Sequence, residues 1–216
     1  MTTITNEQIE QGKTGYTTLI ALFTVAIIGL LILFLLTSKT RVGEQTVTSF
    51  DELGGDFTLQ SADGDVSLSD FKGKTVVMYF GFMSCPEVCP NSLGVIQTAF
   101  NNLSDKELTQ VQGIMISIDP ERDRLQSLDK FTQYFHPKII GITGTNDAVE
   151  KTANQYGAYF DRTEDKENDY LFEHVSRYYV IDPQGDLVGA LRHSTTPNEL
   201  SAKLRETMLG TTLASN

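Results

Sequence analysis

Two cysteines, Cys85 and Cys89, lie close together in the segment FGFMSCPEVCP and are the residues best suited to do chemistry. They follow an apolar run and stand at the expected start of a helix. Backbone amides at a helix amino terminus stabilise a thiolate, so we expect a lowered pKa and a good nucleophile or metal ligand. If the segment is helical, the C-x-x-x-C spacing places the sulfurs one turn apart, and both can face a metal ion or each other.

A metal held by two thiolates needs at least one more ligand, and the chain has three histidines: His136, His174 and His193. His136 precedes a proline at the expected end of a helix, and His193 follows an expected hairpin, so we interpret both as surface or structural residues. His174 stands just ahead of a strand that should share a sheet with the cysteine strand. It is therefore the candidate ligand, with a structural role as the alternative.

Two thiolates and one imidazole form a soft ligand set that suits Cu(I), and that can hold Cu(II) if a further donor joins. Zinc normally takes four ligands in a structural site, and no fourth ligand is evident in the sequence. Copper is accordingly favoured over zinc at Cys85, Cys89 and His174.

A thiol:disulfide oxidoreductase is the rival interpretation, because two cysteines at a helix amino terminus also suit disulfide exchange. Thioredoxin-type exchangers use C-x-x-C and a proline before a late strand. Here the spacing is one residue longer, and Glu173-His174 precedes the late strand instead. We expect binding without enzymatic turnover, and thiol:disulfide reductase activity if the rival is correct. A tethered structural domain with an inert disulfide is a third interpretation.

The segments around the cysteines alternate between strand and helix patterns. Residues 75–82 (TVVMYFGF) and 113–118 (GIMISI) read as buried strands, and an apolar stripe at helical spacing lies between them over 91–103. A parallel crossover is expected from this order. Residues 138–143 (KIIGIT) read as a third strand. The fold class is therefore α/β, with a mixed central sheet flanked by helices.

The remaining elements follow from turn and capping signals. Asp119-Pro120 has the pattern of an N-cap followed by proline, which predicts that a helix begins there. Residues 175–182 and 186–191 flank a proline-glycine turn and predict a closing hairpin. The acidic segment 161–169 (DRTEDKEND) is interpreted as a solvated loop. Further predicted elements are an early hairpin over 57–60 and 66–68, a helix over 146–156 and a final helix over 197–209.

The amino-terminal segment predicts a membrane anchor. Residues 16–36 (YTTLIALFTVAIIGLLILFLL) carry no charge, and as a helix they would span roughly 31 Å, enough to cross a bilayer. The run is longer than the apolar part of a signal peptide and is read as a retained single span. The positive charges that flank it are nearly balanced, so they do not fix its orientation.

The composition excludes some function classes. The formal net charge is -11, which disfavours a nucleic acid partner because phosphates would be repelled by most of the surface. Two cysteines are too few for a disulfide-dense scaffold or a four-cysteine zinc site.

These motifs resemble the Sco/SenC family of membrane-anchored, thioredoxin-like copper proteins that act in assembly of the copper centre of cytochrome c oxidase. The resemblance spans about residues 50–209 and rests on FGFMSCPEVCP, on ISIDPERD and on the histidine of EHVSRYYVIDPQG, which occur in the family's order. Family members often have Tyr-Thr-His ahead of the first cysteine and an aspartate between the cysteines, where this chain has Phe82-Met83-Ser84 and Glu87.

The resemblance implies that Cys85, Cys89 and His174 bind copper, as Cu(I), Cu(II) or both. It implies a metallochaperone that receives copper from an upstream donor and delivers it to the copper-bearing subunit of cytochrome c oxidase or to another copper protein. It further implies an inner-membrane protein whose domain faces the periplasm, or the mitochondrial intermembrane space. The expected organisation is a tail over 1–15, the anchor over 16–36, a tether over 37–49, the copper-binding domain over 50–210 and a tail over 211–216.

Overall fold

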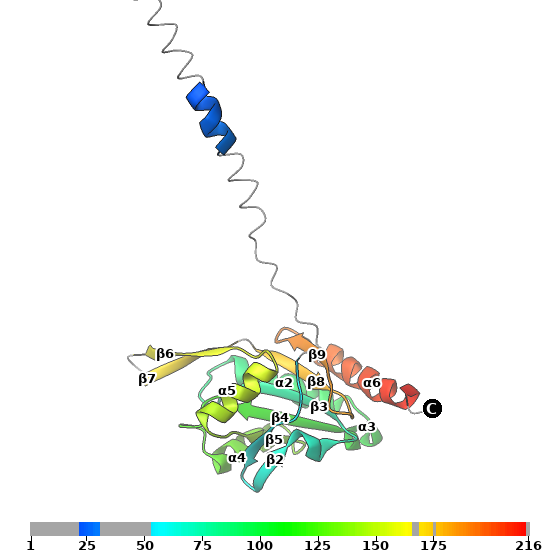
Figure 1. Ribbon diagram of the computed structural model, residues 1–216. Helices are drawn as coiled ribbons and strands as arrows, with labels where there is room; N and C mark the ends of the chain where they lie inside the picture. The colour runs from blue at the N-terminus through cyan, green and yellow to red at the C-terminus, as the bar shows by residue number, and fades with distance from the viewer. Residues whose placement is uncertain (1–21, 31–52, 166–168, 175, 215–216) are drawn as a thin grey trace, which may run out of the picture. The chain divides into compact units, whose positions relative to one another are not determined.

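The computed structural model describes residues 22–30, 53–165, 169–174 and 176–214 (Figure 1). The chain divides into two compact units, Met1–Val47 and Thr48–Asn216. In the first unit, residues 22–30 form an exposed apolar helix. None of the helices built from described residues is long and apolar enough to cross a membrane. The predicted anchor over 16–36 extends beyond the described residues on both sides of this helix and stays a prediction.

A five-stranded mixed sheet forms the centre of the second unit. Its strand order is β5 (Ile139–Ile142), β4 (Val111–Ser117), β3 (Thr75–Gly81), β8 (Arg177–Ile181) and β9 (Leu187–Arg192). The central strand β3 pairs parallel with β4 and antiparallel with β8. Every residue of β3 and β4 is buried, as expected of uninterrupted apolar strands in a sheet covered on both faces. The α/β class, the mixed sheet and the parallel crossover are confirmed.

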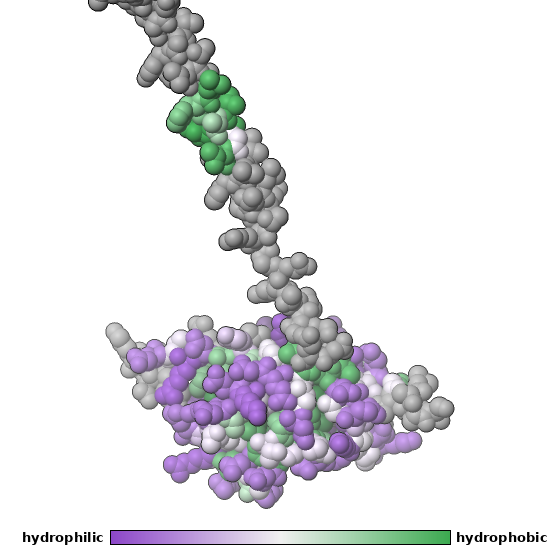
Figure 2. Space-filling view, in the orientation of Figure 1, coloured by the Kyte–Doolittle hydropathy of each residue, from purple (hydrophilic) through white to green (hydrophobic). Residues whose placement is uncertain are grey.

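Helices cover both faces of this sheet. On one face, α2 (Val88–Asn101) contacts both α4 (Leu125–Phe135) and α6 (Pro197–Ala214). On the other face, Tyr156 at the end of α5 (Asn146–Gln155) packs against Tyr179. Successive strand residues point to opposite faces, so the neighbouring Tyr178 lies on the α2 side. Figure 2 shows that the visible surface of this unit is mostly hydrophilic, in keeping with the net charge of -11.

Small elements complete the unit. The early hairpin is confirmed as β1 (Thr58–Ser61) paired with β2 (Gly64–Ser67), and the 3-10 helix η3 (Leu68–Phe71) follows it. The short helix α3 (Asp105–Thr109) lies between α2 and β4. The predicted closing hairpin is confirmed as β8 and β9, and the predicted final helix extends further than expected, as α6.

The acidic segment over 161–169 is not a simple loop, and that prediction is wrong. Its ends form β6 (Phe160–Asp165) and β7 (Asp169–His174), an antiparallel hairpin that extends away from the central sheet (Figure 1). A two-stranded ribbon is held chiefly by backbone pairing and needs few apolar side chains, so its sequence carries a weak strand signal. Residues 161–164 are exposed, as expected of a solvated segment.

The helix predicted to begin at Asp119-Pro120 begins instead at Leu125. The amide of Asp123 donates to the carbonyl of Asp119 (2.9 Å), which closes a single turn that does not continue as a helix. The Asp119 carboxylate accepts a hydrogen bond from the Arg122 side chain and forms a local ion pair with it.

An ion pair fastens α6 to α3, and a hydrogen bond joins α6 to the residue that caps α2. Arg205 Nε lies 2.7 Å from Glu107 Oε1, and Arg205 Nη2 donates to the carbonyl of Asn102 (2.6 Å). Hydrogen bonds from Arg205 and from Ser104 lower the pKa of Glu107 to about 2.

Glu107→Gln should remove this acid-sensitive support. A carboxyl whose pKa falls on folding stabilises the folded state above its ordinary value of 4.5 and loses that effect as the pH drops toward 2. The urea midpoints of wild type and variant should therefore differ at pH 7 and converge on acidification. Glu206→Gln, at a glutamate whose side chain is 71% exposed, is the control. A difference that does not depend on pH would contradict the assignment.

Candidate metal centre

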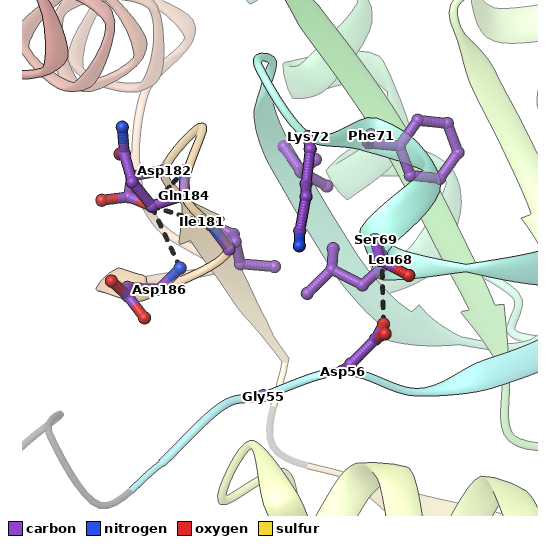
Figure 3. Close-up of a pocket in the computed structure, with 12 residues that line it drawn as sticks. Gly55, Asp56, Leu68, Ser69, Phe71, Lys72, Ile181, Asp182, Gln184 and Asp186 are labelled. Atoms are coloured by element: carbon purple, nitrogen blue, oxygen red, sulfur yellow. Dashed lines mark hydrogen bonds between the residues drawn. The ribbon is translucent and has the colours of Figure 1, made fainter.

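A pocket of about 260 Å³ lies at the edge of the sheet where β3 begins and β8 ends. Val76 and Ile181 line it together with charged side chains, among them Lys72 (Figure 3). The Asp182 carboxylate accepts hydrogen bonds from backbone amides of the β8–β9 turn, so its role is to stabilise that turn. Because the cysteines follow the opposite end of β3, this pocket is remote from the predicted site.

The two cysteines lie where β3 gives way to α2. Cys85 belongs to the connecting loop, and Cys89 is the second residue of the helix. The backbone amide of Cys89 donates to Cys85 Sγ (3.4 Å). The helix start therefore brings the two residues together as predicted, although Cys85 itself lies outside the helix. Cys85 and Cys89 are present as thiols and not as a disulfide.

Burial dominates the electrostatics of the inner cysteine. Cys89 is 0% exposed, and burial raises the pKa of its thiol to about 12. The prediction of a lowered pKa at the helix start is therefore wrong for Cys89, because loss of hydration outweighs the favourable amide environment. Cys85 is 7% exposed and accepts the helix amide. The pair thus consists of an outer sulfur and an inner one.

The floor beneath Cys89 is built by Tyr79 and Gly81 of β3. The Tyr79 hydroxyl donates to Cys89 Sγ (3.6 Å). A Cβ atom at Gly81 would stand 2.6 Å from the Tyr79 ring and 2.9 Å from Cys89 Sγ, which is too close for either. Glycine at this position leaves the space that the ring and the sulfur occupy.

The loop ahead of Cys85 is held by a buried carboxylate. Asp123 Oδ2 accepts the Met83 amide (2.9 Å) and the Ser117 hydroxyl (2.6 Å), and Asp123 is almost fully buried. Burial raises the pKa of Asp123 against the lowering effect of these donors. The turn after β4 is thereby fastened to the cysteine loop.

His174 ends β7, and its neighbours on both sides contact the cysteine-bearing segment. The Phe172 ring lies 5.5 Å from the Phe82 ring, and Ser176 Oγ lies 3.2 Å from the Tyr79 hydroxyl. Two residues span about 7 Å at most, so the backbone of His174 is close to both contacts. The His174 side chain lies outside the described side chains, and among those described no group of three or more His, Cys, Asp or Glu residues could hold a metal.

The other two histidines have the roles that were predicted. His136 is mostly buried, its Nδ1 accepts the Lys138 amide (3.0 Å), and its ring packs against Phe100. Burial lowers the pKa of His136, so it is a neutral structural residue. His193 is exposed in the turn that follows β9.

Comparison with known proteins decides the family. Residues 45–209 match the SCO1/SenC family model. The chain belongs to the SCO1/SenC family. It is 38% identical over 157 residues to protein SCO2, mitochondrial, of Saccharomyces cerevisiae, covering 71% of this chain and 52% of that protein. The chain spans about half the length of the curated relatives that it matches first.

Solved structures of SCO1/SenC relatives share the fold. Arabidopsis thaliana ScoI with copper bound has a TM-score of 0.68 and 31% identity, covering 73% of this chain and 99% of that one. Yeast Sco1 with copper bound has a TM-score of 0.65 and 34% identity, covering 72% and 87%. The predicted thioredoxin-like fold of this family is confirmed, and these two homologous structures contain copper.

The donor set of this chain fits a soft metal ion. Two sulfurs held together at the end of a strand suit Cu(I), which prefers thiolate ligands. An incoming metal can displace the proton of a buried thiol, because a coordinated thiol is deprotonated outright. The raised pKa of Cys89 therefore does not prevent metal binding. It means that metal binding releases the thiol proton.

Sequence reasoning missed three supporting residues: Tyr79, Gly81 and Asp123. Tyr79 carries a polar hydroxyl in a mostly apolar strand, and a buried tyrosine hydroxyl normally finds a hydrogen-bond partner, so its role could have been anticipated. Gly81 ends the same strand just before the cysteines. The partners of Asp123 lie in distant segments, and nothing local pointed to them.

Asp123→Ala should destabilise the domain and loosen the cysteine loop. The Met83 amide and the Ser117 hydroxyl would lose their common acceptor, at a cost of about 1–3 kcal/mol. Urea unfolding measures this cost. The exposed turn residue Asp63 supplies the control, because Asp63→Ala should change stability by no more than about 0.5 kcal/mol. Equal stabilities of the two variants would show that Asp123 does not hold the loop.

Proposed function

We propose that this chain is a copper-binding metallochaperone that holds copper through Cys85, Cys89 and His174. The observation that carries the proposal is the convergence of two distant segments at one end of the sheet. The cysteine loop contacts β7 through Phe82 and Phe172, and β3 contacts the residue two positions after His174. The copper-bound relatives support copper as the metal.

The two sulfurs have different parts in this proposal. Cys89 is buried at the base of the site and is held by Tyr79. Cys85 is nearer the surface and is the first ligand that a thiolate of an acceptor can replace. Stepwise replacement of the outer ligand and then the inner one transfers copper without leaving it uncoordinated. Neutral His174 completes the set and leaves a soft, exchangeable site.

The acceptor is inferred from the family. We propose the copper-bearing subunit of cytochrome c oxidase or another copper protein as the acceptor, with an upstream protein as the copper donor. The anchor over 16–36 would tether residues 50–210 to the inner membrane, facing the periplasm or the mitochondrial intermembrane space. The mitochondrial relatives support this location.

The difference in exposure between the cysteines also favours a second function. An outer cysteine that is 7% exposed and an inner cysteine that is 0% exposed resemble the attacking and resolving residues of disulfide exchange. The alternative is therefore a tethered reductase that reduces cysteines of a copper-protein partner. The raised pKa of Cys89 makes it a poor nucleophile at neutral pH, so Cys85 would attack.

Copper loading of the reduced protein tests the proposal. One copper per chain should survive desalting in wild type, and Cys85→Ser or Cys89→Ser should abolish stable loading. His174→Ala should retain copper more weakly, at about a 10–100-fold cost in affinity. His193→Ala removes an exposed histidine and is the matched control, with retention like that of wild type. Metal analysis and competition with a Cu(I) chelator give the readouts.

Two results would contradict parts of this proposal. Unchanged affinity in His174→Ala would remove His174 from the site. Failure of wild type to retain copper, together with rapid exchange between its dithiol and a test disulfide, would favour the reductase. Cys85→Ser should lose both copper loading and exchange, so His174→Ala distinguishes the two functions: it should weaken copper binding and keep both sulfurs for exchange.

A further inference from the structure

We propose that the Tyr79 hydroxyl is a positioning group that fixes the Cys89 sulfur and joins it to the segment that follows His174. This inference rests on the proposed function, because it assigns how the ligand set is held together. Tyr79 does not itself bind the metal. It acts through Cys89 on one side and through Ser176 on the other.

The contacts of Tyr79 carry the inference. Its hydroxyl lies 3.6 Å from Cys89 Sγ and 3.2 Å from Ser176 Oγ. Cys89 is ten positions from Tyr79 in sequence, and Ser176 is 97 positions away. A single hydroxyl therefore connects the start of α2 with the junction between β7 and β8.

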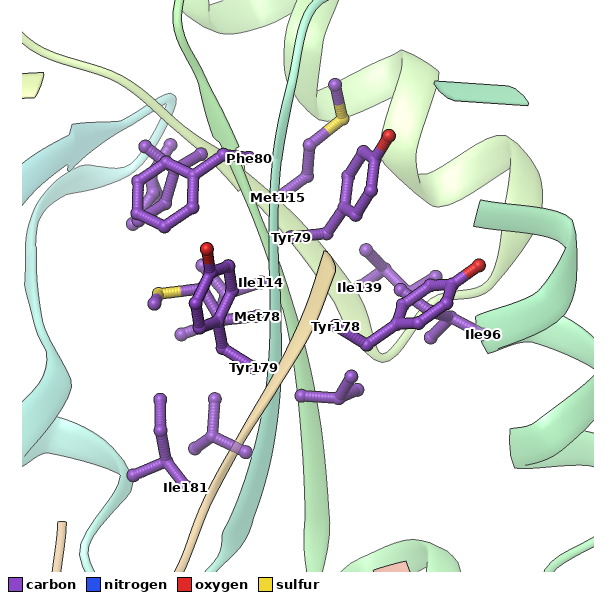
Figure 4. Packing of buried hydrophobic residues seen from close by; sticks show 14 of the residues in the cluster. Met78, Tyr79, Phe80, Ile96, Ile114, Met115, Ile139, Tyr178, Tyr179 and Ile181 are labelled. Atoms are coloured by element: carbon purple, nitrogen blue, oxygen red, sulfur yellow. The ribbon is translucent and has the colours of Figure 1, made fainter. Parts of the chain in front are cut away.

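The ring that carries this hydroxyl is fixed by packing. Tyr79 is fully buried, and its ring lies 5.9 Å from that of Tyr178 in the neighbouring strand (Figure 4). The absence of a side chain at Gly81 gives the ring and the sulfur their shared space. A hydroxyl on a ring held in this way has little freedom to leave its partners.

The chemistry of a hydroxyl suits this position. A tyrosine hydroxyl donates one hydrogen bond and can also accept, as can a serine hydroxyl. The Tyr79 hydroxyl is the donor to both Cys89 Sγ and Ser176 Oγ, so its one hydrogen is shared between the sulfur and the serine oxygen. A hydrogen bond to a coordinated thiolate orients it and withdraws electron density, as outer groups around metal ligands do. Tyr79 would thus tune the Cys89 sulfur and restrain the segment that bears His174.

Tyr179 provides a matched control within the same strand pair. It is also a buried tyrosine, but it lies on the opposite face of the sheet, where its ring packs against Phe80 (Figure 4). Its hydroxyl meets no hydrogen-bond partner in the described part of the chain. Removal of either hydroxyl deletes one oxygen from the core, but of these two hydroxyls only that of Tyr79 donates to a cysteine sulfur.

The test compares Tyr79→Phe with Tyr179→Phe in the full-length chain in detergent. Copper is the probe, and the readouts are chelator competition and the thiolate-to-Cu(II) charge-transfer bands. Tyr79→Phe should fold, bind copper about 10–100-fold more weakly and shift the bands to lower energy. Ser176→Ala removes the acceptor that shares the Tyr79 hydrogen with the sulfur, so it should shift the bands in the opposite direction by a smaller amount. Tyr179→Phe should match wild type.

The outcomes separate this inference from the proposed function. Bands and affinity in Tyr79→Phe that match wild type, or equal changes in Tyr179→Phe, would overturn the positioning role. If wild type retains no copper, the proposed function fails and the Cys85–Cys89 dithiol is titrated instead against a glutathione redox buffer. Loss of the hydrogen bond to reduced Cys89 should then make the midpoint potential more negative in Tyr79→Phe alone. Equal midpoint potentials in wild type, Tyr79→Phe and Tyr179→Phe would overturn the inference.

Discussion

The Cys89 sulfur is packed at a junction of three segments, and the rest of the site depends on that packing. β3 contributes Tyr79 and the space at Gly81, and α2 contributes Cys89. The third segment follows β7 and contacts the Tyr79 hydroxyl through Ser176. Any element that shifted would either expose the sulfur or crowd it. The central position of β3 in the sheet is what keeps the three segments in place.

Two opposing effects act on this pair of thiols. At the helix start, Cys85 Sγ accepts a hydrogen bond from the backbone amide of Cys89. Burial removes Cys89 from water and raises the pKa of its thiol to about 12. Dehydration prevails at Cys89 because the sulfur is fully enclosed. Such a thiol stays protonated at neutral pH until a metal displaces the proton, which suits a binding site better than a site of rapid exchange.

The fold could be predicted from sequence because its central strands carry strong local signals. The apolar runs that became β3 and β4 are long and uninterrupted, and the helix between them requires a parallel crossover. The β6–β7 hairpin was missed because a solvated ribbon lacks such a signal. The helix expected at Asp119 begins later because Asp119 binds Arg122 and because the Asp123 carboxylate is engaged by the cysteine loop.

Part of the site could also be predicted, because the cysteine motif is a local sequence signal. Cys85 and Cys89 are close in sequence, so their proximity could be predicted, and the family resemblance supplied His174. The supporting contacts of Tyr79 and Asp123 join residues that are far apart in the chain, and only the folded structure brings them together. The Cys89 pKa is raised because distant segments enclose the sulfur, and a local motif does not encode that enclosure.

X-ray absorption at the copper edge of the loaded protein tests the central claim most directly, because it identifies the atoms bound to the metal. We predict two sulfur neighbours and an imidazole nitrogen, with the imidazole signal lost in His174→Ala and kept in His193→Ala. Copper surrounded only by oxygen and nitrogen, or an imidazole signal that survives in His174→Ala, would contradict it.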